Sequence, residues 1–169
     1  MQDLLNTLDI EMSRDSISTP DGLARFAAEH ALALSFDPDD LERCRVFREA
    51  LRHMCSAHAG IDASARTVAL LNEQLAQAPL IVRTNCQGAV EFEPQAGLTG
   101  ASGLLAAVAA QITQARVAGT WERLKACEAQ NCRWVYYDRS SAGHSRWCTM
   151  KICGSRAKMR AYRDRTQPA

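Results

Sequence analysis

Four of the seven cysteines in this 169-residue chain form two close pairs near the C-terminal end. The pattern is Cys127-x4-Cys132, then fifteen residues, then Cys148-x4-Cys153. Each pair can supply two thiolates from one turn, and the chain between them can fold back to complete a tetrahedral metal site. Four thiolates with no open position favour Zn²⁺ first and an iron–sulfur cluster second. The spacing therefore predicts that these four cysteines bind one structural Zn²⁺.

The other candidate thiols and ligands are less informative. His144 is a rival ligand in the same window, but we expect it to be a loop residue because four cysteines already close the shell. The scattered Cys44, Cys55 and Cys86 are expected to be ordinary buried thiols. The chain shows no basic leader and no apolar run near the ~18 residues of a membrane span, which predicts a cytoplasmic protein without a membrane partner. In that compartment, paired cysteines indicate a metal rather than disulfides.

Charge is unevenly distributed along the chain, although the net charge is only +1. Residues 1–120 carry nine Lys and Arg against fifteen Asp and Glu, whereas residues 121–169 carry eleven against four. A basic module on an acidic body suggests an anionic partner for the module, with mutual attraction of the two parts as the alternative. The overall composition, 47% hydrophobic and 23% charged, is that of a globular protein rather than a disordered or fibrous one.

The elements before residue 120 are expected to be mainly helical. Helical periodicity and end signals predict helices over 23–34, from Asp37 to Gly60, over 62–78 and over 102–125. Asp37 is a good N-cap because Pro38 can take the first helical position and acids follow it. Two β-prone runs, 80–82 and 89–92, predict a hairpin between the third and fourth of these helices.

The elements after residue 120 must bring the two cysteine pairs together. Residues 133–138 are aromatic and β-prone, which predicts a short hairpin packed on the metal site. Residues 154–165 predict a helix with arginines along one face, while Met159 and Tyr162 cover the zinc core from the other side. A segment this small needs the folding free energy that metal binding supplies.

The expected fold class is α+β and mainly helical. Residues 1–120 would form a helical domain with a small β-hairpin. Residues 121–169 would form a treble-clef-like Cys₄ zinc finger that ends in a basic helix. This helix is the predicted nucleic-acid contact, because a rigid element lined with cations suits a phosphate backbone.

The segment from Arg146 to Lys158, with Cys127 and Cys132, resembles the CGNR zinc finger family, whose name corresponds to residues 153–156 here. Ser155 stands where the family has Asn, but both side chains can hydrogen-bond to nearby backbone, so we expect the turn to be kept. Further upstream, the segments that resemble the ABATE domain, which precedes the finger in such proteins, are Asn6-Thr7, Thr19-Pro20 and 47–52.

This resemblance implies a stress-induced transcription regulator of bacteria that contacts DNA with its finger. It also implies that the four cysteines are the zinc ligands. The candidate nucleic-acid contacts are Arg146, Arg156 and Lys158 from the resemblance, to which the helix pattern adds Arg160 and Arg163. RNA stays open as a partner because aromatic residues of the finger could stack on unpaired bases. A homodimer is expected because one finger offers little contact surface, and the N-terminal domain is expected to take a ligand that the sequence does not identify.

Two other functional classes follow from the residues alone. The zinc could merely stabilise a protein-interaction module, or it could be released when its thiolates oxidise. An enzyme is not expected, because the sequence contains no glycine-rich phosphate loop, nucleophile elbow or metallohydrolase motif. A closed Cys₄ shell would also leave no position for a catalytic water.

Overall fold

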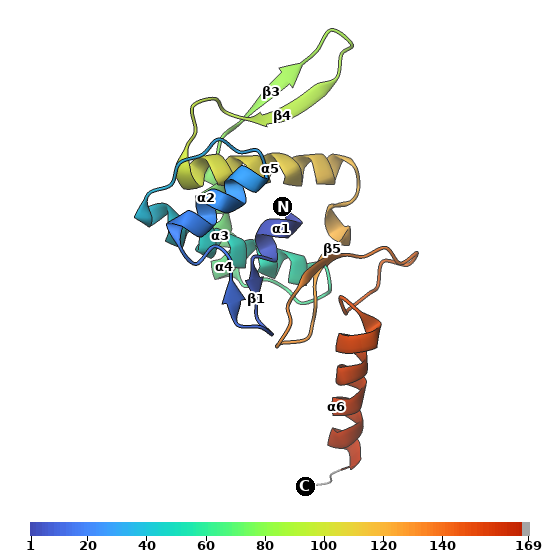
Figure 1. Cartoon of the computed structure of the whole chain (residues 1–169). Coiled ribbons are helices and arrows are strands. Elements are labelled where there is room, and N and C mark those ends of the chain that lie inside the picture. Colours follow the sequence, from blue (N-terminus) through green and yellow to red (C-terminus); the bar gives the residue numbers. More distant parts are fainter. Residues whose placement is uncertain (167–169) are drawn as a thin grey trace.

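The computed structural model describes residues 1–166, and Figure 1 shows a helical body from which a hairpin and the last helix project. The strands form three separate antiparallel pairs, β1–β2, β3–β4 and β5–β6. The protein is therefore α+β and mainly helical, as the sequence predicts. Its elements in chain order are α1 (Gln2–Leu5), β1 (Leu8–Asp9), β2 (Arg14–Asp15), α2 (Pro20–Glu29), α3 (Pro38–Ala57), α4 (Ala65–Ala76), β3 (Leu80–Thr84), β4 (Val90–Pro94), α5 (Gly100–Val117), η1 (Trp121–Arg123), β5 (Leu124–Ala126), β6 (Val135–Tyr137), η2 (Met150–Gly154) and α6 (Ser155–Thr166).

Helix α3 is the centre of the body and contacts α1, α2, α4, α5 and β5. It begins as predicted, because the Asp37 side chain accepts hydrogen bonds from the backbone N–H groups of Asp39 and Asp40. The Asp40 carboxylate accepts from the Asp37 N–H in return, which completes a capping box. The same carboxylate accepts from the N–H of Ala101 and so joins the first turns of α3 and α5. A Cβ at Gly100 would lie 2.3 Å from an Asp40 oxygen, so this approach requires glycine.

Two helices differ from their predicted ends for local reasons. Helix α2 begins at Pro20 because the Thr19 side chain accepts from the N–H of Gly22, and it ends at Glu29, before the left-handed residue Ala31 (φ 56°). Helix α4 begins only at Ala65, where the Ser64 hydroxyl caps its first turn.

Helix α5 ends at Val117, so the prediction of a helix up to residue 125 was wrong. Gly119 takes a left-handed conformation (φ 65°) that terminates the helix. The chain then passes through the 3₁₀ turn η1 into the strand β5. Residues 124–126 are thus extended, and their partner strand β6 lies beyond the first cysteine pair.

The β3–β4 hairpin confirms the prediction for residues 80–92. Its register pairs Leu80 with Pro94 and Thr84 with Val90. It packs against α5 and extends beyond it in Figure 1. None of its residues belongs to the cluster of four cysteines.

The β5–β6 hairpin is packed into the body rather than beside it. Leu124, Ala126 and Val135 belong to the same buried cluster as Leu51 of α3 and Leu105 of α5. A second, smaller cluster contains Cys127, Ala129 and Cys153. The hairpin therefore carries the cysteine site on a strand pair that the main core already holds.

Candidate metal centre and nucleic-acid interface

The first cysteine pair lies in the tight turn of the β5–β6 hairpin. The N–H of Cys127 donates to the carbonyl of Trp134 at 2.9 Å, which continues the strand ladder. The N–H groups of Cys132 and Arg133 both donate to the carbonyl of Ala129, at 2.8 and 2.9 Å. This turn, residues 127–134, is called the knuckle below. The predicted hairpin within 133–138 is corrected, because that segment supplies only β6 and its partner strand precedes Cys127.

The second pair lies at the entry to α6. Cys148 precedes the π-type turn η2, and Cys153 lies within it. The Ser155 hydroxyl donates to the carbonyl of Met150 at 3.1 Å, the local backbone bond expected of the residue that replaces Asn. Gly154 is tightly surrounded, since a Cβ there would lie 2.2 Å from the sulfur of Met150. The turn thus presents Cys153 toward the knuckle at the start of a helix.

The structure brings all four predicted cysteines together, with their Sγ atoms within 4.8 Å of one another. Cys148 Sγ lies 3.7 Å from Cys132 Sγ and 3.7 Å from Cys153 Sγ. Tetrahedral Zn²⁺ with Zn–S bonds of about 2.3 Å separates its sulfur ligands by about 3.8 Å, so the set fits this ion. None of the four forms a disulfide, whose S–S bond is about 2.05 Å.

The electrostatics of the cluster also indicate a cation site. The Cys132 thiol donates to Cys127, which lowers the pKa of Cys127 to about 5 with help from the N–H groups of Cys148 and Ala129. The same bond raises the pKa of Cys132, and burial raises the pKa of Cys148 to about 12. The hydrogen bonds around Cys127 therefore favour its thiolate form. Four thiolates require a cation to offset their charge.

The remaining metal-binding candidates lie outside this cluster. His144 is exposed and is not part of the four-sulfur group, in agreement with its expected place in a loop. Cys44 and Cys55 are buried in α3, as expected. Cys86 is exposed in the β3–β4 turn, so its predicted burial was wrong.

A buried ion pair shapes the loop between the two cysteine pairs. Lys125 Nζ lies 3.0 Å from Asp138 Oδ2, and both side chains are almost fully buried. Burial alone would raise the pKa of Asp138, but hydrogen bonds from Ser140, Lys125 and Ser145 lower it well below its usual value. Residues 138–145 are thereby tethered to β5, which brings the chain back toward the knuckle. Sequence reasoning missed this pair, since neither residue stands in a recognisable motif.

The knuckle is also fixed to the helical body by polar side chains. Arg52 of α3 is fully buried and donates to the carbonyl of Arg133 at 2.9 Å and to the carbonyl of Leu5. The Asn6 side chain accepts from the N–H of Val135 and donates to its carbonyl, both at 2.8 Å. These contacts hold β6 and the knuckle against α1 and α3. No pattern in the sequence indicates that Arg52 is a core residue.

Helix α6 is attached very differently. It packs mainly against η2, contains no buried residue and extends away from the body in Figure 1. Arg156 pairs with Glu11 at 2.7 Å. Met159 and Tyr162 are each 59% exposed, so the prediction that they cover the zinc core was wrong. Apart from the Arg156–Glu11 pair, α6 is joined to the core mainly through the turn that holds Cys153.

The five predicted nucleic-acid contacts occupy different environments. Arg146 makes a bidentate ion pair with Glu128, with Nε–Oε1 at 2.7 Å and Nη2–Oε2 at 2.6 Å. Its guanidinium carbon lies 5.3 Å from the centroid of the Trp147 ring. Arg156 has its partner Glu11. Within residues 1–166 the others make no ion pair, and they are exposed on α6: Lys158, Arg160 and Arg163.

The basic face of α6 borders a shallow groove. The groove has a volume of about 490 Å³ and runs along the turn and the helix. Its cationic lining consists of Lys151, Arg156, Arg160 and Arg163. Helical spacing places the last three on one side of α6, whereas Lys158 faces nearly the opposite side.

Two protein families match this chain, one over each part. Residues 1–119 match the ABATE family, described as "Putative stress-induced transcription regulator", and residues 123–166 match the CGNR zinc finger. The chain belongs to the ABATE family and carries a CGNR zinc finger after it. A search of the curated proteins found no match to this chain. No helix among residues 1–166 is long and apolar enough to cross a membrane.

Proposed function

We propose that this protein is a zinc-dependent transcription regulator of the bacterial cytoplasm that contacts DNA with helix α6. The observation that carries the proposal is the state of this helix, which is exposed along its length and bears basic residues on two sides. Lys158, Arg160 and Arg163 make no ion pair within residues 1–166, and exposed cations of this kind favour an external anion. The family match supports a regulatory role.

The shape of α6 suits the major groove of duplex DNA, which admits one α-helix. Arg156, Arg160 and Arg163 on one side could reach base edges or one phosphate strand, and Lys158 could reach the other strand. Arg146 is a weaker candidate because Glu128 already engages its guanidinium. The same cations could bind RNA, so a comparison of nucleic acids belongs in the test.

Zinc is the ion that the four thiolates fit best, and its proposed role is structural. Cys127, Cys132, Cys148 and Cys153 would hold it, joining the knuckle to the entry of α6. When bound, the ion supplies folding free energy rather than reactivity, because a closed Cys₄ shell leaves no position for substrate or water. We accordingly propose a binding protein and not an enzyme.

A second candidate function is protein interaction through the same segment. Met150, Ile152, Met159 and Tyr162 are between 48% and 59% exposed. Apolar side chains along a projecting helix favour a protein partner, including a second copy of this chain. Thiol oxidation belongs to this alternative as well, because Cys132 and Cys148 are only half-buried.

The proposal is tested by titrating a fluorescent random-sequence duplex with zinc-loaded protein at several salt concentrations. The double change Arg160→Ala and Arg163→Ala should weaken binding and reduce the slope of log affinity against log salt by about 1.8, or about 0.9 for each phosphate that the variant no longer neutralises. Arg25→Ala, which removes an exposed cation from α2, is the matched control and should leave both unchanged.

Several results would count against this proposal. Salt-independent binding, or equal loss of affinity in the Arg25→Ala control, would remove α6 as the contact. A protein with one zinc per chain, by elemental analysis, that binds no duplex but forms dimers would favour the protein-interaction alternative. Preference for single-stranded RNA over duplex would redirect the proposal to RNA.

A further inference from the structure

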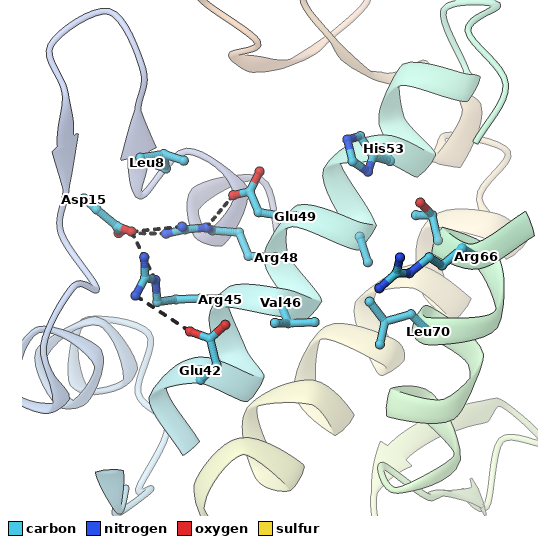
Figure 2. A pocket seen from close by; sticks show the side chains of 12 residues that line it. Leu8, Asp15, Glu42, Arg45, Val46, Arg48, Glu49, His53, Arg66 and Leu70 are labelled. Atoms are coloured by element: carbon cyan, nitrogen blue, oxygen red, sulfur yellow. Dashed lines mark hydrogen bonds and ion pairs between the residues drawn. The ribbon is translucent and has the colours of Figure 1, made fainter. Parts of the chain in front are cut away.

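A pocket of about 490 Å³ opens between α3, α4 and the β1–β2 hairpin (Figure 2). None of its lining residues belongs to the finger. Its size falls in the range of about 300–1,000 Å³ that is typical of small-molecule sites. Most of its surface is apolar. The apolar side chains are Leu8 of β1, Val46 and Ala50 of α3, and Leu70 of α4.

The acidic groups of the pocket are already engaged by arginines. Arg48 makes two bonds to the Asp15 carboxylate, at 2.7 and 2.9 Å, and a third to Glu49 at 2.9 Å. The guanidinium of Arg45 lies between Asp15 and Glu42, at 3.7 and 3.8 Å. The negative charges of these carboxylates are therefore neutralised by Arg45 and Arg48 within the pocket wall. They leave little capacity to bind a cationic ligand.

The opposite wall carries a cation that has no such partner. Figure 2 shows Arg66 and Leu70 on α4, across from Asp15, Arg48 and Glu49. Among residues 1–166 the Arg66 guanidinium makes no ion pair, and it projects from the first turn of α4, where the helix dipole also favours an anion. His53 stands near it on α3, and burial lowers the pKa of His53, so its ring is a neutral hydrogen-bond partner at pH 7.

A second group on the wall also lacks an acceptor. The Nε atom of Arg45 is buried and has no hydrogen-bond partner in the described structure, since Asp15 at 3.7 Å is too distant. This donor faces the Asp15 carboxylate inside the acidic wall and is closed to solvent, so Arg66 is the cation that a ligand can reach. The pocket thus offers an apolar surface and one unpaired cation.

We propose that this pocket binds a small monocarboxylate with an apolar body. The carboxylate would lie at Arg66, with the apolar body against Leu8, Val46 and Leu70. Arginine suits this headgroup because its planar donors can bind both carboxylate oxygens. The site is separate from the metal centre and from α6, so ligand binding does not depend on whether the finger binds DNA.

The pocket has a physical connection to the knuckle. An adjoining groove shares His53 and Thr67 with it and is lined on its far side by Cys127 and Arg133. Glu49 of the pocket wall also lies 3.2 Å from Arg52 Nε. Arg52 in turn donates to the Arg133 carbonyl inside the knuckle. A ligand that shifts Glu49 would therefore displace a group that orients the metal site.

The test uses the zinc-loaded full chain and two matched probes, 4-phenylbutyrate and its neutral amide 4-phenylbutyramide. Binding is measured by calorimetry and by ¹H–¹⁵N chemical-shift changes, without DNA, so that failure here is distinct from failure of the proposed function. We expect the carboxylate to bind about tenfold more tightly than the amide. The shift changes should centre on the pocket residues of α3 and α4.

Variants assign the effect to particular groups. Arg66→Gln should abolish the preference for the carboxylate, Arg66→Lys should keep part of it, and Thr67→Trp should block both probes by filling the pocket. Arg25→Gln removes an equal charge from an exposed position on α2 and should change nothing. Thermal unfolding of each variant checks that the fold is retained.

Three results would overturn the proposal. Equal affinity for acid and amide would remove the carboxylate as the recognised group. A carboxylate preference that survives Arg66→Gln, or shift changes confined to α6, would place binding elsewhere. Absence of saturable binding of both probes to the folded protein would show that the pocket does not take this class of ligand.

Discussion

The two halves of the cysteine site are held in opposite ways. Cys127 and Cys132 lie on a hairpin whose strands share the main core and whose knuckle receives a hydrogen bond from the buried Arg52. Cys148 and Cys153 lie in a turn that leads into α6, a helix with no buried residue. The body already fixes the first half, so the ion's main structural task is to hold the second.

This difference separates stability from function within one short segment. The knuckle is hydrogen-bonded to Arg52 of α3 and the adjoining Val135 to Asn6, whereas the cations of α6 face outward. A substitution that loosens the knuckle should therefore lower mainly the free energy of unfolding. A substitution on α6 should change mainly the affinity for a partner. Three substitutions test this difference.

Loss of the metal should have the largest effect. Cys148→Ser removes a ligand on the α6 side and should reduce zinc from one per chain to nearly none, because a structural Zn²⁺ contributes about 10–16 kcal/mol in finger peptides. The helices of the body should remain, so circular dichroism should lose only a signal the size of α6, while duplex binding is lost. Zinc by elemental analysis and far-ultraviolet dichroism measure the two effects.

Cys86→Ser is the control, because Cys86 is an exposed thiol far from the cluster in sequence. It should keep both zinc and structure. If Cys148→Ser instead unfolds the whole body, the knuckle is not independently held and the comparison between the two halves is wrong.

Arg52→Ala should have the next largest effect. The change leaves Glu49 without one of its arginine partners and removes the donor to the carbonyls of Leu5 and Arg133. Breaking a buried charged network of this kind costs about 3–5 kcal/mol. Urea unfolding with zinc present measures it, with Arg25→Ala as an exposed control expected to change stability by less than about 0.5 kcal/mol. A destabilisation as small as that of the control would show that packing alone holds the knuckle.

Glu11→Gln should have the smallest effect and is the sharpest test of the exposed half. Glu11 and Arg156 pair across the gap between the β1–β2 hairpin and α6, and both side chains are about half exposed. The unfolding midpoint should not change measurably, because exposed ion pairs contribute little. Duplex affinity should rise by about twofold, since the change frees Arg156 and removes a negative charge beside the helix. Lower affinity would mean that this pair orients α6 for binding.

The sequence predicts most of the local structure because its signals are local. Asp37 and Pro38 mark the start of α3, and the spacing of the four cysteines indicates the turns that bring them together. The fold class follows from such patterns. The resemblance over residues 146–158 adds the family, which the match of residues 1–119 and 123–166 confirms.

The remaining features depend on partners that are distant in sequence. Leu124 to Ala126 form a strand only because β6 pairs with them from beyond the knuckle, so periodicity extended the preceding helix over them. Arg48 and Arg52 look like surface residues of an amphipathic helix until Asp15, Leu5 and Arg133 are placed around them. Met159 and Tyr162 were likewise predicted to cover the zinc core, but both are 59% exposed on α6 and neither belongs to the cluster around the cysteines.

The contacts of α1 have a consequence for how the protein is made. Gln2 and Asn6 hydrogen-bond to Val135, a residue that follows them by more than 120 positions. A ribosome releases α1 first, yet the strand β6 that forms these hydrogen bonds is translated more than 120 residues later. This surface of the nascent body therefore stays uncovered until β6 emerges. The entropy cost of closing so long a loop must be met before its contacts can form. Completion of the fold and capture of the metal therefore wait until the segment from β6 to Cys153 has been translated.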